Sequence, residues 1–173
     1  MLDIIIPTYK ARTTLPAALD SLVAQTKRLF IVTIVQDCDG ENYSDIIKTY
    51  TERGLHIRLL STPKNGGPGV ARQLGIDSTF CQHIMFLDSD DMLMPQAVEC
   101  LTREIIGNDA DLVCSSMLME QEKGIYTPLN VDEVGCQWCA GKIYSTSYLR
   151  DNNLRFREDI RRNEDSYFNL VAT

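Results

Sequence analysis

Short apolar runs alternate with longer amphipathic segments through the first 120 residues of the sequence. The apolar runs occupy residues 3–8, 30–37, 56–62, 83–88 and 110–119. Nearly continuous hydrophobic runs of this length are typical of strands that are buried on both faces of a sheet. Segments with helical spacing lie between them, at residues 13–26, 43–54, 67–79 and 95–107. The alternation therefore predicts an α/β fold, with a mostly parallel central sheet and helices on both faces.

The pattern loosens after residue 120. We expect irregular chain from residue 122 to Cys136, a short helix at residues 145–153, and a last helix that starts at Glu164 and in which the chain stops. No repeat, low-complexity tract or linker divides the sequence. We therefore expect residues 1–173 to form a single domain that lacks some C-terminal elements.

The charge balance and the hydrophobic pattern argue against several classes of partner. The chain has a net charge of −7 and no basic stripe, which disfavours binding to nucleic acid. No apolar run approaches the roughly 18–20 residues of a membrane span, and the N-terminus lacks the basic start of a signal peptide. We expect a cytoplasmic protein, and association with the inner face of a membrane stays open, as does the oligomeric state.

In parallel α/β sheets a ligand binds beyond the carboxyl ends of the strands. Four predicted strands end in polar or glycine-containing sequence, at residues 7–9, 37–40, 64–67 and 88–91. We expect these segments to converge on one site. Two common nucleotide motifs do not fit it, because the first strand ends in PTYKAR instead of a G-x-G-x-x-G turn and GCQWCAGKI has the wrong spacing for a P-loop.

The sequence IMFLDSDDM, at residues 84–92, ends a buried strand in three carboxylates. Asp88 and Asp90 share one side of an extended chain, and Asp91 joins them if the chain turns there. Like charges gathered in this way require a positive partner. Carboxylate oxygens are ligands that Mg²⁺ and Mn²⁺ prefer. We favour a divalent-metal site that also receives a phosphorylated ligand over the alternative that this segment only caps the following helix.

Four segments, taken in order, resemble the nucleotide-binding half of the family 2 glycosyltransferases: IIIPTYKARTTLPAALDSLVAQT, VQDCDG, NGGPGVARQLGID and IMFLDSDDMLMP. A fifth, GKIYSTSYLRDNNLRF followed by NEDSY, resembles the acceptor-side segment of that family and its ED motif. The resemblance covers nearly the whole chain. It implies a GT-A fold, which is Rossmann-like, with residues 1–120 binding a nucleotide-sugar and residues 121–173 facing the acceptor.

On the nucleotide side, the resemblance implies that Asp37 hydrogen-bonds the uracil ring, where a carboxylate accepts the imide N–H. Further nucleotide contacts are implied for Pro7, Thr8, Tyr9, Asn65, Gly67, Arg72, Asp88, Ser89 and Asp90. Glycine lets backbone amides approach a phosphate closely. Arg72 is suited to pair with an acid or a phosphate oxygen.

On the metal and acceptor side, the resemblance implies that Asp90 lies near the ribose and that Asp91, beside Asp90, holds Mn²⁺ or Mg²⁺ on the diphosphate. Asp165 is implied as the catalytic base, with Glu164 next to it. Asp165 would take the proton of an acceptor hydroxyl that attacks the anomeric carbon from the opposite face, so that the configuration inverts. A carboxylate neighbour such as Glu164 raises the pKa of a base toward neutrality, where a base works best.

The resemblance therefore implies an inverting, metal-dependent glycosyltransferase of hexosyl or N-acetylhexosaminyl type that uses a UDP-sugar. The expected acceptor is a saccharide, a lipid-linked compound or a protein, in the synthesis of a surface polysaccharide or glycoconjugate. Two alternatives remain. One is a nucleotide-sugar-binding module without independent transfer activity, because members of the family usually continue past the ED helix. The other is a nucleotidyltransferase, whose glycine-rich first loop has no counterpart in PTYKARTT.

Overall fold

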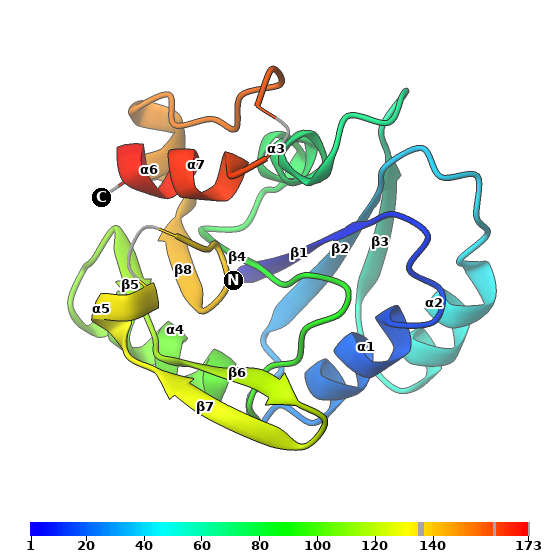
Figure 1. Cartoon of the computed structure of the whole chain (residues 1–173), viewed down its shortest axis with the longest axis horizontal. Coiled ribbons are helices and arrows are strands. Elements are labelled where there is room, and N and C mark those ends of the chain that lie inside the picture. The colour runs from blue at the N-terminus through cyan, green and yellow to red at the C-terminus, as the bar shows by residue number, and fades with distance from the viewer. Residues whose placement is uncertain (135–136, 161, 173) are drawn as a thin grey trace.

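The computed structural model of the chain describes residues 1–134, 137–160 and 162–172. These residues contain a six-stranded sheet in the order β3-β2-β1-β4-β8-β5 (Figure 1). Its strands are β1 (Leu2–Thr8), β2 (Phe30–Gln36), β3 (Ile57–Ser61), β4 (His83–Phe86), β5 (Leu112–Cys114) and β8 (Lys142–Ser145). The pairs β1–β2, β2–β3 and β1–β4 are parallel, whereas β8 runs antiparallel to β4 and β5. The prediction of a mostly parallel central sheet is confirmed.

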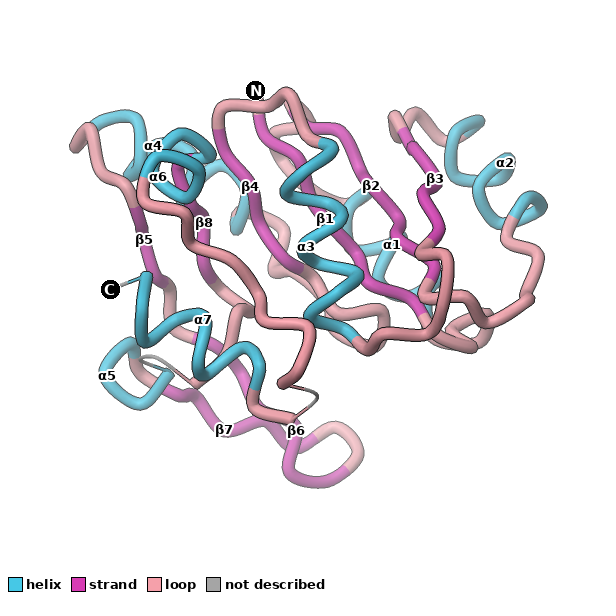
Figure 2. The backbone as a smooth tube through the Cα atoms, turned by 90° about the horizontal axis from the view of Figure 1, so that it is seen from above, coloured by secondary structure: helices cyan, strands magenta, loops and turns pink. Residues whose placement is uncertain are grey.

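Helices cover both faces of this sheet (Figure 2). One face packs against α1 (Leu15–Val23), α2 (Ser44–Glu52) and α4 (Ala97–Gly107), and the other against α3 (Pro68–Ser78), α6 (Thr146–Asp151) and α7 (Glu164–Ala172). In β1, Ile4 and Ile6 belong to the first core and Ile5 to the second. Because successive side chains of a strand point to opposite faces, a continuous apolar run supplies both cores. No helix in the described part of the chain is both long and apolar enough to cross a bilayer.

The prediction of one strand at residues 110–119 is wrong, because this segment contains two strands. Its first part is β5, after which the chain leaves the sheet and forms β6 (Met117–Glu122). β6 pairs with β7 (Ile125–Leu129) in a separate two-stranded sheet. The apolar run loses its continuity at Ser115 and Ser116, and most of the hairpin beyond them is exposed.

The expectation of irregular chain from residue 122 to Cys136 is also wrong for the part that the structure describes. Gly124, with a φ of +82°, lies in the turn between β6 and β7, and α5 (Val131–Val134) follows. Cys136 lies outside the described residues. The sequence also does not predict β8, because its four residues, KIYS, are too few to show a period and include only two apolar side chains.

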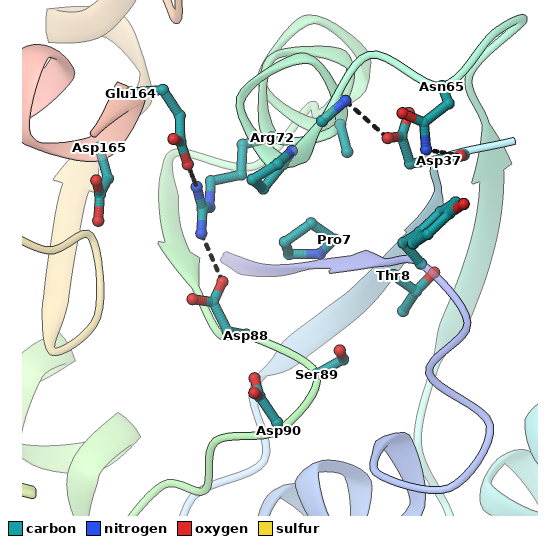
Figure 3. Close-up of a pocket in the computed structure, with 14 residues that line it drawn as sticks. Pro7, Thr8, Asp37, Asn65, Arg72, Asp88, Ser89, Asp90, Glu164 and Asp165 are labelled. Atoms are coloured by element: carbon teal, nitrogen blue, oxygen red, sulfur yellow. Dashed lines mark hydrogen bonds and ion pairs between the residues drawn. The ribbon is translucent and has the colours of Figure 1, made fainter. Parts of the chain in front are cut away.

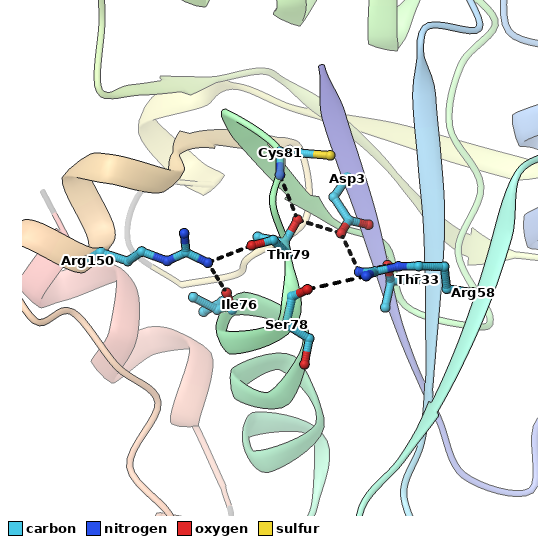
Figure 4. Close-up of polar contacts among 8 residues, drawn as sticks. All are labelled: Asp3, Thr33, Arg58, Ile76, Ser78, Thr79, Cys81 and Arg150. Atoms are coloured by element: carbon cyan, nitrogen blue, oxygen red, sulfur yellow. Dashed lines mark hydrogen bonds and ion pairs between the residues drawn. The ribbon is translucent and has the colours of Figure 1, made fainter.

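A polar network fastens the C-terminal end of α3 to the sheet (Figure 4). The buried carboxylate of Asp3, on β1, accepts the hydroxyl of Thr79 at 2.6 Å and Nη2 of Arg58 at 3.2 Å. From the other side, Arg150 of α6 donates to the carbonyl of Thr79 at 2.7 Å. These contacts fix α3, whose opposite end reaches the carboxyl ends of the strands.

Candidate active site

A cleft of about 530 Å³ lies at the carboxyl ends of β1, β2 and β4 (Figure 3). It is lined by the end of β1, by the loops that follow the parallel strands and by the N-terminal parts of α3 and α7: Pro7, Thr8, Tyr9, Asp37, Asn65, Gly67, Pro68, Ala71, Arg72, Asp88, Ser89, Asp90, Glu164 and Asp165. The four strand-end segments therefore meet, as expected. Of the predicted site residues, Asp91 is the one that does not line the cleft. Pro68 and Ala71 line it without having been predicted, because the sequence does not reveal which side of α3 faces the cleft.

Asp37 is buried, and its carboxylate holds the loop that follows β3. Oδ1 accepts the hydroxyl of Thr62 at 2.8 Å and the amide of Gly66 at 2.9 Å, and Oδ2 accepts the amide of Gly67 at 2.7 Å. The side-chain amide of Asn65 donates to the carbonyl of Asp37 at 3.3 Å. The glycine amides that we expected to face a phosphate therefore bind a protein carboxylate. Gly67 has a φ of +87°, a conformation that glycine adopts without steric cost.

Arg72, on α3, bridges two carboxylates that come from different elements. Its side chain is only 4% exposed, with Nη2 at 2.6 Å from Oδ1 of Asp88 and Nη1 at 2.9 Å from Oε1 of Glu164. Its guanidinium carbon lies 5.8 Å from the ring centroid of Phe156. Burial by itself would lower the pKa of Arg72, but the charges of Asp88 and Glu164 outweigh burial and raise the pKa above its usual value. Arg72 thus connects the strand end of β4 to α7.

The acidic strand end turns as the sequence suggested, because the amide of Asp91 donates to the carbonyl of Asp88 at 3.1 Å. The pKa of Asp91 is raised to about 6, first by the loss of surrounding water and then by the charges of Asp88 and Asp90. Arg72 neutralises Asp88, and the described residues supply no ion pair to Asp90 or Asp91. They also contain no group of three His, Cys, Asp or Glu side chains that could hold a metal ion. Two carboxylates completed by phosphate oxygens and water are nevertheless a donor set that fits Mg²⁺.

Asp165 lies in the first turn of α7, on the side of the cleft opposite Asp37 (Figure 3). Its Oδ1 accepts the amide of Ser166 at 2.9 Å. The pKa of Asp165 is raised, mainly by burial and further by the charge of Glu164, in the direction that we expected. The two acidic residues have different surroundings, since the carboxylate of Glu164 is engaged by Arg72.

The profile of the family described as Glycosyl transferase family 2 matches residues 3–161 of the chain. The chain is 28% identical over 192 residues to the uncharacterized glycosyltransferase EpsJ of Bacillus subtilis (strain 168), covering 99% of the chain and 56% of EpsJ. It is 27% identical over 184 residues to the poly(ribitol-phosphate) beta-N-acetylglucosaminyltransferase TarS of Staphylococcus aureus (strain Mu50 / ATCC 700699), covering 98% of the chain and 32% of TarS. The chain thus spans about half, or less, of the length of these relatives.

Solved structures lead to the same group of proteins. The crystal structure of residues 1–349 of S. aureus TarS matches with a TM-score of 0.86 at 25% identity, over 99% of this chain and 54% of that one. The same part of TarS in complex with UDP matches with a TM-score of 0.84, again at 25% identity, over 99% of this chain and 54% of that one. The agreement confirms the fold that the sequence resemblance implied.

Proposed function

Because the chain belongs to glycosyl transferase family 2, we propose that it transfers a sugar from a UDP-sugar to an acceptor hydroxyl, with inversion at the anomeric carbon. The observation that carries the proposal is one cleft with Asp165 on one side and Asp37 on the other, and with Arg72 and Asp88 between them. Residues 1–120 would hold the donor and residues 121–173 would supply the base, as two halves of one domain. The cytoplasmic location stays a prediction.

Asp37 suits the recognition of a uracil ring. Its carboxylate accepts three donors from the protein, from Thr62, Gly66 and Gly67. The amide of Gly66 is shared between the two oxygens, at 2.9 Å from Oδ1 and 3.2 Å from Oδ2, so of the about four lone-pair directions of the carboxylate the one that receives the longer contact can accept one more donor. The imide N–H of uracil is such a donor, whereas the corresponding nitrogen of cytosine is an acceptor. The solved complex of TarS with UDP supports the choice of UDP.

Asp165 is proposed as the general base. The acceptor oxygen forms a bond to the anomeric carbon while the bond from that carbon to the diphosphate oxygen breaks, and its electron pair leaves with UDP. Asp165 takes the hydroxyl proton, and its raised pKa brings it closer to the range in which a base is effective. Glu164 forms an ion pair with Arg72, so we propose that it positions Arg72 and does not act as a second general base.

Asp90 and Asp91 are proposed to hold a divalent cation, Mn²⁺ or Mg²⁺. Burial, and after it the charges of Asp88 and Asp90, raise the pKa of Asp91, and a bound cation would offset both effects. When bound, such a cation would neutralise the charge that develops on the departing diphosphate. Arg72 and Asp88 would align the same end of the donor from the protein side.

The transferred group and the acceptor are proposed from the relatives. TarS is named as a beta-N-acetylglucosaminyltransferase and a relative from Bacillus spizizenii as a beta-glucosyltransferase, both acting on poly(ribitol-phosphate). We therefore infer a hexosyl or N-acetylhexosaminyl group. The acceptor would be a hydroxyl of a surface polysaccharide or glycoconjugate, carried by a saccharide, a lipid or a protein.

Calorimetric titration of UDP in the presence of Mn²⁺ tests the donor site. Binding should require the metal, disappear with EDTA and weaken at least tenfold in Asp91→Ala, the loss of one charged contact. Asp151→Ala is the matched control, because this exposed carboxylate on α6 does not line the cleft. If GDP, CDP or dTDP binds and UDP does not, the assignment of uracil as the nucleobase of the donor is wrong. If no nucleotide binds with metal present, the proposed donor site is wrong for this chain.

The alternative is a module that binds the nucleotide-sugar without independent transfer. A panel of UDP-sugars, scored for slow release of free sugar, separates the two functions. Release that disappears in Asp165→Asn supports a transferase, whereas tight UDP binding without any release supports the binding module.

A further inference from the structure

Outside the cleft, the carboxylate of Asp39 joins the loops that follow β1 and β2. Oδ2 accepts the amide of Lys10 at 2.7 Å, and Oδ1 accepts the amide of Glu41 at 2.9 Å and the side-chain amide of Gln36. Partial burial opposes ionisation, but these hydrogen bonds hold the pKa of Asp39 below its usual value. Asp39 does not line the cleft, so its contacts serve the loops and not a ligand directly.

Tyr43 completes the connection. Its ring is 1% exposed, and its hydroxyl accepts the amide of Ala11 at 3.0 Å while lying 2.7 Å from Oδ2 of Asp39. Burial raises the pKa of Tyr43, and its hydrogen bonds to Asp39 and Glu41 raise it further. The phenol therefore stays protonated and acts as a hydrogen-bond donor. A single buried tyrosine thus links the backbone of the first loop to the carboxylate of the second.

The two loops need this support because each contains a strained residue. Lys10 has a φ of +51° and Cys38 a φ of +49°, which is uncommon for residues other than glycine. Such conformations persist only where the surrounding contacts hold them. The residues immediately before them, Tyr9 and Asp37, line the cleft. Tyr9 is 52% exposed, so its ring is available to a ligand.

We infer that Asp39 and Tyr43 act together as a positioning clamp, which fixes the distance between Tyr9 and Asp37 and so sets the affinity and selectivity for the nucleotide base. The inference rests on the proposed function, because that function places the nucleobase of the donor between these two loops. The clamp does not touch the ligand. Without the clamp, the backbone at Lys10 would relax, and the distance between Tyr9 and Asp37 would no longer be fixed.

Asp39→Asn and Tyr43→Phe test the clamp. Tyr43→Phe removes one oxygen and keeps the buried ring, so the chain should still fold. The chain offers a matched control in Asp20 and Tyr50, which form the same kind of pair at 3.0 Å between α1 and α2, away from the cleft. The controls are Asp20→Asn and Tyr50→Phe. Each variant is titrated with UDP and with CDP in the presence of Mn²⁺, and hydrogen exchange is measured at the amides of Lys10 and Ala11.

The clamp predicts that UDP binds roughly tenfold more weakly to both clamp variants, the loss of one hydrogen bond to a charged group. It also predicts a smaller preference for UDP over CDP and faster exchange at Lys10 and Ala11, whereas the control variants keep the UDP affinity and the preference. A purely structural role would lower stability in all four variants without changing the preference for UDP, and that result would overturn the inference. If the unaltered chain bound UDP and CDP equally or not at all, the proposed recognition of uracil would fail first, and the clamp would fail with it.

Discussion

Arg72 and Glu164 form a buried ion pair across 92 positions of the sequence, with 2.9 Å between Nη1 and Oε1. Their side chains are 4% and 9% exposed. The pair joins α3, which is fastened to the sheet at its other end, to the first turn of α7. Because Asp165 is the next residue of α7, the position of the proposed base depends on a contact made by its neighbour.

Glu164→Ala is expected to lower the free energy of unfolding by roughly 2–4 kcal/mol, because Arg72 stays buried with Asp88 as its remaining charged partner. Glu164→Gln keeps an acceptor oxygen and is expected to cost clearly less. Urea denaturation monitored by circular dichroism measures both. Glu122→Ala, at an exposed position of β6, is the control and should change stability little. Equal losses in the two Glu164 variants would argue against the ion pair.

The pH dependence of catalysis should depend on the same pair. Asp165 must be ionised to act as a base, and its pKa is raised, so activity should rise with pH through a value above the ordinary one of about 3.9. The charge of Glu164 contributes to the raised pKa of Asp165, and Glu164→Gln removes that charge. Ionisation of Asp165 then becomes easier, and the acidic limb of kcat should move to lower pH. An unmoved or upward-shifted limb would contradict the assignment.

Asp165→Asn should separate catalysis from donor binding. The amide cannot accept a proton at neutral pH, so kcat should fall by roughly 10²–10⁴-fold. UDP affinity should stay close to that of the unaltered chain, because the residues proposed to contact the nucleotide are unchanged. Steady-state kinetics and calorimetry on the same preparation measure the two quantities. A parallel loss of kcat and UDP binding would mean that Asp165 belongs to the donor site.

Gly75→Ala should destabilise the protein even though alanine favours helices. A Cβ at position 75 would lie 2.5 Å from Cγ2 of Ile5, which is fully buried and cannot move aside. Overpacking of this kind costs roughly 1–3 kcal/mol. Gly107→Ala is the matched control on α4, since nothing lies within 4 Å of the added atom there. Thermal unfolding should show a lower Tm for the first variant and an equal or higher one for the second.

Asp3→Asn should alter how stability depends on pH. Burial raises the pKa of Asp3 above its unfolded value, in spite of its contacts with Thr79, Thr33 and Arg58. The ionised carboxylate therefore penalises the folded state once the pH exceeds the unfolded pKa of about 3.9, and the penalty is complete above the raised folded pKa. Relative to the unaltered chain, Asp3→Asn should become more stable as the pH rises from 4 to 7. A stability difference that is constant over this range would contradict the raised pKa.

Much of the fold follows from local patterns. The near-continuous apolar runs that became β1 and β2 predict strands with two covered faces, and the placement of Ile4 and Ile5 in opposite cores agrees. The prediction fails where local pattern carries little information. β8 has four residues, and it takes its place between β4 and β5 by pairing with strands from elsewhere in the chain. The run at residues 110–119 divides between two sheets because the pairing partners of its two parts differ.

The alternation of apolar runs and helices predicts which segments lie at the carboxyl edge of the sheet, because parallel strands joined by helices all end at the same edge. That argument placed Asp37 and Asp88 in one region, and the family resemblance added Arg72 and Asp165. The contacts that each of these side chains makes are known only from the folded chain. Asp37 binds the glycine amides and Arg72 binds Glu164, because side-chain partners depend on the packing of elements far apart in sequence, which no local pattern encodes.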